Sequence, residues 1–120
     1  MLFPKLKPVV QIILVIQAIC MLMGTYTHVN WVVSHGFLYP DVPLYSRLFW
    51  DSLTFLDPLA AVLLFLRPRT GIVLVLAIIC ADVLHNAIIG GVGLFFFLQV
   101  IFCVFVLATF RINWRGAAQK

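Results

Sequence analysis

IVLVLAIICADVLHNAII (residues 72–89) is the stretch that decides the fold of this 120-residue chain. Its length falls within the range of about 17–25 apolar residues that cross a bilayer core as a helix. Yet Asp82, His85 and Asn86 lie inside it and share one helix face, at spacings of i, i+3 and i+4. Polar side chains within a span usually face the bundle interior and have a partner. The stretch therefore predicts a membrane helix with one polar face.

Three more apolar runs are long enough to span a membrane, at about residues 9–31, 49–66 and 94–110. The chain is 64% hydrophobic and only 10% charged, whereas soluble domains carry about 25% charged residues. So few charges cannot cover a water-facing surface. We expect an all-α integral membrane protein, with residues 1–120 forming a single polytopic domain. Turn-forming residues at 67–71 and 90–93 separate the last three runs and predict an antiparallel four-transmembrane-helix bundle.

The cations predict the orientation of this bundle. Four spans place the N-terminus, the second connection and the C-terminus on one side, and seven of the eight cations lie there. Only Arg47 lies on the other side. By the positive-inside rule both termini are cytoplasmic, in a bacterial inner membrane. The seven cations on the cytoplasmic side are Lys5, Lys7, Arg67, Arg69, Arg111, Arg115 and Lys120.

The same cations argue against nucleic acid as a partner, because they lie at the ends of apolar runs and do not form one basic patch. Membrane lipid is the partner that this distribution indicates. The outer connection, residues 32–48, is rich in Phe, Tyr, Leu and Pro. Tyr and Trp favour the membrane interface. Residues 32–48 are therefore either a structural segment lying in that interface or a lid over an outward-facing pocket.

Each expected helix carries one polar side chain near the membrane midplane. At 1.5 Å per residue, Gln17, Asp57, Asp82 and Gln99 lie about 13–18 Å from the cytoplasmic ends of their helices. Side chains at one depth can form an interhelical network if they face inward.

A second polar layer lies nearer the outside. Asp51, His85, Asn86 and His28 are expected in the outer half of the membrane, whereas the inner half has no titratable side chain within the spans. This asymmetry predicts a polar pocket open to, or close to, the outer face. The expected ligand-binding residues are Gln17, His28, Asp51, Asp57, Asp82, His85, Asn86 and Gln99.

The first functional hypothesis is that this pocket binds a small ligand, a proton or a metal ion, in a transporter or its subunit. Four helices cannot surround a solute pathway alone, so it requires a homo-oligomer or a partner membrane subunit. Imidazole and carboxylate ligands from His28, Asp51, Asp82 and His85 would suit a divalent metal such as Zn, Mn or Fe. Haem held by His28 and His85 is disfavoured, because their depths differ by about 7 Å from the helical rise.

Two alternatives stay open, so the sequence does not decide whether the chain is an enzyme. Asp57, Asp82 and His85 are candidate catalytic residues for acid–base chemistry on a lipid-soluble substrate. Alternatively, the polar side chains only hold the helices together in a structural or accessory subunit. The three cysteines, Cys20, Cys80 and Cys103, have no metal-ligand or disulfide-framework spacing and are interpreted as packing residues.

Overall fold

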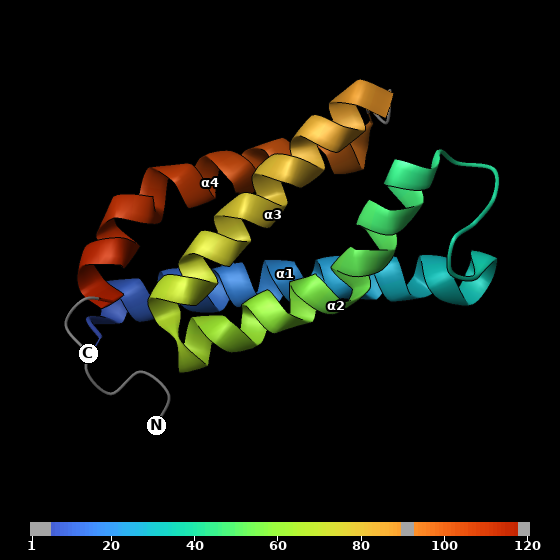
Figure 1. The fold of residues 1–120 in the computed structure, drawn as a ribbon. Helices are drawn as coiled ribbons and strands as arrows, with labels where there is room; N and C mark the ends of the chain where they lie inside the picture. Colours follow the sequence, from blue (N-terminus) through green and yellow to red (C-terminus); the bar gives the residue numbers. More distant parts are fainter. Residues whose placement is uncertain (1–5, 90–92, 118–120) are drawn as a thin grey trace.

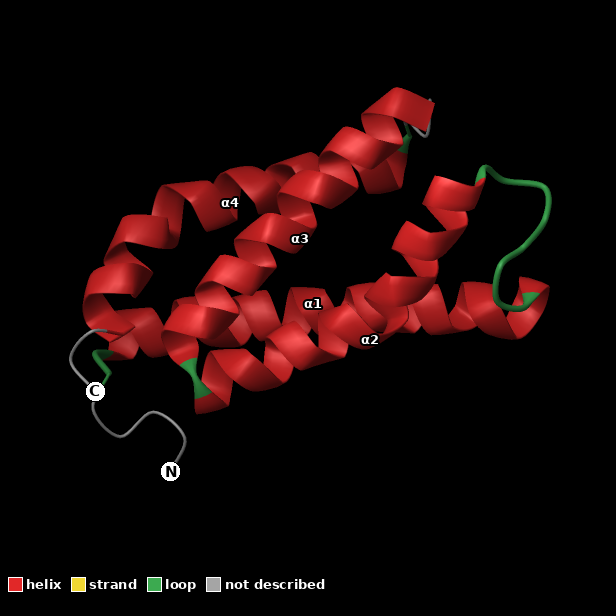
Figure 2. Ribbon diagram, viewed as in Figure 1, coloured by secondary structure: helices red, strands yellow, loops and turns green. Residues whose placement is uncertain are grey.

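Four helices make up the fold in the computed structural model, which describes residues 6–89 and 93–117. Each helix is long and apolar enough to cross a membrane, which indicates an integral membrane protein. Figure 2 shows only helices and short connections among the described residues. The helices are α1 (Pro8–His35), α2 (Leu44–Leu66), α3 (Pro68–Ile89) and α4 (Leu94–Ala117) (Figure 1).

The helices extend into the segment that the sequence predicts as the outer loop at 32–48, so only residues 36–43 lie between α1 and α2. Gly36 ends α1 with a positive φ of 79°, and its N–H donates to the Val32 carbonyl at 2.7 Å. Pro43 precedes α2, and its ring fixes the backbone at a helix entry. Most of the break expected at 90–93 lies outside the described residues, as do Lys5 and Lys120.

Close contacts show which helix ends lie together. A methyl group built on Gly116 of α4 would come within 2.7 Å of the Val10 side chain of α1. Arg69 of α3 donates through its guanidinium to the Trp114 carbonyl of α4, at 3.2 and 3.1 Å. We call this end of the molecule, where α2 also turns into α3, the turn end. The opposite end, which holds residues 36–43, is the loop end (Figure 1).

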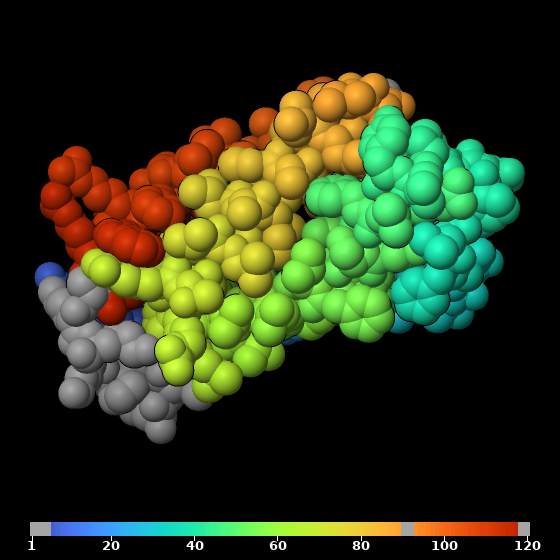
Figure 3. Space-filling view, in the orientation of Figure 1, coloured from blue at the N-terminus to red at the C-terminus, as the bar shows by residue number. Residues whose placement is uncertain are grey.

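Aliphatic side chains from all four helices fill the interior toward the turn end. Leu14, Leu64, Val75 and Val106, one from each helix, are fully buried. Figure 3 shows α2 and α3 side by side on one face of the molecule. The two helices approach closely at Gly71, whose missing side chain leaves room for the α2 backbone.

A bend in α2 sets the shape of the loop end. Figure 1 shows the first turns of α2 leaning toward the far end of α3. Pro58 lies inside α2, where its ring lacks an N–H and crowds the carbonyl of Thr54 four residues earlier. The bend brings Ser46 to His85 of α3, with 2.7 Å between Oγ and Nε2.

Helix α4 is most deeply buried toward the turn end. Its buried residues all belong to the second half of the helix, toward the turn end. In the first half, Leu94, Phe95, Phe97, Leu98 and Ile101 are all exposed. Little of the first half of α4 is therefore covered by the other helices, and this leaves room for a cavity beside α1.

We predict that Gly71→Ala destabilises the fold. The new Cβ would lie 2.5 Å from the Leu64 nitrogen and 2.7 Å from the Leu63 carbonyl carbon, and neither backbone atom can rotate away. Overpacking of this kind costs about 1–3 kcal/mol in free energy of unfolding. Unfolding in detergent measures the loss, with Gly93→Ala as the control, because nothing lies within 4 Å of a Cβ at Gly93. Equal stability of the two variants would contradict the close approach of α2 and α3.

Candidate intramembrane ligand site

A cavity of about 200 Å³ lies between α1 and α4 in the half of the bundle near the loop end. Two carboxylic acids, Asp57 of α2 and Asp82 of α3, contribute to its lining. Both are buried. The cavity is therefore bounded by all four helices, and its walls are mostly apolar. The remaining lining residues are Cys20, Met21, Met23, Gly24, Thr27, Ile78, Ile79, Phe95, Leu98, Gln99 and Phe102.

Asp57 lies directly against the backbone of α1. A Cβ on Gly24 would come within 2.6 Å of Asp57 Oδ2, so only glycine leaves room for the carboxylate in this position. The same oxygen is 3.7 Å from His28 Nε2. The other oxygen, Oδ1, is buried and has no hydrogen-bond partner. The Asp57 side chain lines the cavity and is only 3% exposed, so its carboxyl group can accept a hydrogen bond from a ligand there.

Asp82 belongs to a short chain of hydrogen bonds between α3 and α4. Asn86 Nδ2 donates to Gln99 Oε1 at 2.6 Å, and Gln99 Nε2 donates to Asp82 Oδ2 at 3.2 Å. The spacing of Asp82 and Asn86 by four residues allows both to face Gln99 from one side of α3. The hydrogen bond from Asn86 therefore orients the Gln99 amide, and one N–H of that amide donates to the Asp82 carboxylate.

The mouth of the cavity is apolar. Met23 of α1 and Phe95 of α4 line the cavity and are 64% and 72% exposed, so they lie at its opening. Leu98 lies at the opening as well. A span exposes such side chains to hydrocarbon, so a ligand entering here would come from the lipid. The sequence predicts an outward-facing pocket, whereas this opening lies at the side, between two helices.

His85 does not line this cavity. Its Nε2 contacts Ser46 of α2, and its ring packs against Tyr45, Phe49 and Trp50, with centroids 5.9, 5.0 and 5.2 Å away. His85 therefore joins α3 to the leaning first turns of α2. Contact between Ser46 and His85 was not predicted from the sequence, because the bend at Pro58 decides which residues of α2 reach α3.

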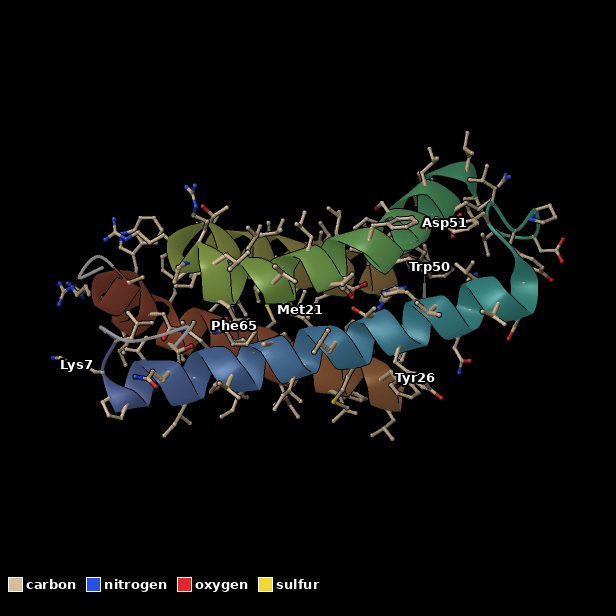
Figure 4. The ribbon with its side chains drawn as sticks, turned by 90° about the horizontal axis from the view of Figure 1, so that it is seen from below. Lys7, Met21, Tyr26, Trp50, Asp51 and Phe65 are labelled. Atoms are coloured by element: carbon tan, nitrogen blue, oxygen red, sulfur yellow. The ribbon has the colours of Figure 1, made fainter. Side chains whose placement is uncertain are left out.

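Asp51 is also placed outside the cavity. Its Oδ2 accepts a hydrogen bond from the Leu38 N–H at 2.6 Å, and this fixes residues 36–43 against α2. Figure 4 shows Asp51 and Trp50 near the loop end, far from Lys7. Nearby, the Tyr39 hydroxyl donates to Asp41 at 3.0 Å, and this hydrogen bond raises the pKa of the phenol above its usual value.

The four residues considered as metal ligands have four different partners. His28 contacts Asp57, Asp51 contacts Leu38, Asp82 contacts Gln99 and His85 contacts Ser46. Across residues 6–89 and 93–117, no group of three or more His, Cys, Asp or Glu side chains is placed to hold a metal ion. The expected two-histidine, two-carboxylate set is therefore not gathered in one place.

Two fully buried amides lie outside the cavity lining. Gln17 of α1 is one helical turn before Met21, and Asn113 belongs to the packed half of α4. Neither side chain has a hydrogen-bond partner for its nitrogen or its oxygen. Gln17 was expected in the ligand site, whereas Asn113 was missed because it follows the apolar run that ends at residue 110. The burial of Asn113 is indicated in the sequence by its spacing of seven residues from Val106, another buried residue, because residues seven apart share a helix face.

Cys80 of α3 and Cys103 of α4 lie beside each other, with 3.8 Å between the sulfur atoms. Both are free thiols, and neither lines the cavity. Their contact joins the same two helices as the Asn86–Gln99–Asp82 chain, which agrees with their interpretation as packing residues.

Comparison of the chain with protein-family models, curated proteins and solved structures finds no match in any of the three.

We predict energetic coupling between Asn86 and Gln99. Interhelical hydrogen bonds in membrane proteins contribute about 0.6 kcal/mol on average, with a maximum near 1.7 kcal/mol. A double-mutant cycle with Asn86→Ala and Gln99→Ala, measured by unfolding in detergent, should give a coupling free energy of about that size. The control pair is Asn86→Ala with Asn113→Ala, whose effects should add because the structure shows no contact between the two. Additive effects in the first pair would contradict the hydrogen bond.

Proposed function

We propose that this protein binds a small lipid-soluble ligand within the membrane, in the cavity between α1 and α4. In this proposal the four helices form an antiparallel bundle in a bacterial inner membrane, with both termini in the cytoplasm. The turn end then faces the cytoplasm, and the cavity lies in the outer half of the membrane. The protein works as a homo-oligomer or beside a partner membrane subunit.

The observation that supports this proposal most strongly is that Asp57, a buried acid with one unpaired oxygen, lines the cavity. Oδ1 is buried in an apolar bundle, and an unpartnered buried polar atom costs about 1–3 kcal/mol. The side chain also lines a cavity with an apolar mouth. Apolar walls with a few fixed polar groups are typical of small-molecule sites. A ligand that satisfies Oδ1 would recover the cost of burying the acid.

A lipid-soluble ligand fits the site better than a metal ion does. The candidate metal ligands each contact a different partner. Apart from Asp57 and Asp82, the cavity lining consists mostly of sulfur and hydrocarbon groups. Divalent cations with oxygen and imidazole ligands need several such donors around one point. Transport is a broader form of the same proposal, in which partner subunits would provide the path to the cytoplasm.

A membrane enzyme is the second candidate. His28 Nε2 lies 3.7 Å from Asp57 Oδ2, so an imidazole and a carboxyl group meet at the edge of the cavity. Such a pair can exchange protons with a bound substrate when the distance shortens on binding. In this candidate Asp57 and Asp82 act on a lipid-soluble substrate, while His85 belongs to the structural contact with Ser46. Turnover of the ligand bound in the cavity distinguishes the enzyme from a binding protein.

We predict that Thr27→Trp removes the ligand. Thr27 is an exposed residue of the cavity lining, so an indole at this position would block the opening. A steric cost of about 1–3 kcal/mol weakens binding by about 5- to 150-fold. Extraction of the purified protein and mass spectrometry should find a molecule that accompanies the wild type and is strongly reduced in the variant.

The control for this experiment is Val29→Trp, an exposed position two residues further along α1 that does not line the cavity. It adds the same indole to the lipid-facing surface and should retain the ligand. Equal ligand content in wild type and Thr27→Trp would contradict binding in the cavity. It would favour the structural alternative, in which the polar residues only hold the helices together.

We also predict that a reporter fused after Lys120 is cytoplasmic. Lys7, Arg67, Arg69 and Arg115 lie at the turn end, whereas Arg47 is at the loop end. A paired set of fusions measures this, with alkaline phosphatase, which is active only outside, and green fluorescent protein, which is fluorescent inside. Phosphatase activity without fluorescence would reverse the proposed orientation.

A further inference from the structure

The cavity offers hydrogen-bond acceptors to a ligand. The carboxyl groups of Asp57 and Asp82 both line it, and one oxygen of Asp57, Oδ1, has no hydrogen-bond partner. The amide nitrogen of Gln99 already donates to Asp82, and the Thr27 hydroxyl already donates to the Gly24 carbonyl at 2.8 Å. The unsatisfied groups of the lining are therefore mainly carboxyl oxygens, and a ligand that matches them brings donors.

The charge of the lining also favours a positively charged donor. Two acids line the cavity, and no Lys or Arg among residues 6–89 and 93–117 does. His28 is a basic group next to one of these acids, with its Nε2 3.7 Å from Asp57 Oδ2. Buried carboxylates are costly without a counter-charge, and an ammonium group would neutralise them while donating to Oδ1.

The apolar part of the lining fits the rest of such a ligand. Phe95 and Phe102 bring aromatic rings to the cavity, and aromatic faces attract cations. Met21 and Met23 add flexible thioethers, which adapt to different shapes and pack against rings. A cavity of about 150 Å³ in another protein holds benzene, so the 200 Å³ here accommodates a ring-sized body.

We propose that the ligand is a lipophilic amine, which enters from the lipid between α1 and α4 and places its ammonium group between Asp57 and Asp82. This inference rests on the proposed function, since it names the chemical class of the ligand for the same cavity. Its ring-sized apolar body contacts Phe95, Phe102 and the methionines, and any longer chain extends through the mouth into the membrane.

Three probes of matched shape test the class of ligand. They are 1-naphthylmethylamine, its neutral counterpart 1-naphthylmethanol and the anionic 1-naphthoic acid. Binding to the full-length protein in nanodiscs of zwitterionic lipid is measured by titration calorimetry, after subtraction of empty nanodiscs. We expect the amine to bind about tenfold more tightly than the alcohol, the factor that one charge-assisted hydrogen bond provides. We expect no binding of the acid.

Asp57→Asn keeps the shape of the side chain and removes its charge, so it should abolish the preference for the amine. Asp51→Asn is the matched control, because Asp51 bonds to Leu38 outside the cavity, and it should leave the preference unchanged. Thr27→Trp is the second test variant, which blocks the cavity without altering either acid, and it should weaken amine binding by about tenfold or more.

The outcomes separate this inference from the proposed function. Equal binding of amine and alcohol that is lost in Thr27→Trp would overturn the amine while leaving the cavity as a ligand site. Amine binding that survives both Asp57→Asn and Thr27→Trp would overturn the inference, since the probe then binds elsewhere. Failure of all three probes to bind also overturns it, and if no molecule accompanies the purified wild type, the proposed function fails with it.

Discussion

The burial of the Asp57 carboxylate against α1 is the constraint on which the rest of this site depends. An acid inside an apolar bundle needs a partner, but only one of the two Asp57 oxygens has a polar neighbour. Oδ2 faces His28, while Oδ1 has none. Gly24 allows this arrangement because any side chain there would collide with the carboxylate. Pro58 follows Asp57 directly and bends α2, so the acid lies where the helix changes direction.

The two ends of the molecule have different roles because of how α4 packs. Near the turn end, Gly116 allows α4 to lie directly on Val10, and the interior is filled by aliphatic side chains. Near the loop end, the first half of α4 stays largely exposed, and the cavity lies between it and α1. Stability therefore comes mainly from one half of the bundle. Of the chain's four acids, Asp41 and Asp51 lie toward the loop end, and Asp57 and Asp82 lie near the middle of their helices.

Much of this architecture could be predicted from the sequence. The length of the apolar runs indicated four membrane-spanning helices, and the structure has four helices of suitable length and composition. Counting residues along each run grouped Asp57, Asp82 and Gln99 at one depth, and all three line the cavity. Depth is predictable because the rise of a helix is constant.

The rotation and tilt of the helices could not be predicted in the same way. Depth counting grouped Asp51 and His85 with the pocket, but the bend at Pro58 brings Ser46 to His85, and Asp51 bonds to Leu38. Those contacts depend on the angle of the bend and on the course of residues 36–43. Depth also failed to predict the surroundings of Gln17. It placed Gln17 in a hydrogen-bond network between the helices, but the Gln17 amide has no hydrogen-bond partner.

The most direct test of the central claim is an experimental density map of the wild-type protein, solved in lipid at a resolution that shows individual side chains. The account predicts elongated density between α1 and α4, with its polar end within hydrogen-bond distance of Asp57 Oδ1 and its apolar end passing Met23 and Phe95 toward the membrane. A map in which α1 and α4 close together over Asp57, or in which protein side chains satisfy Oδ1 and fill the cavity, would contradict it.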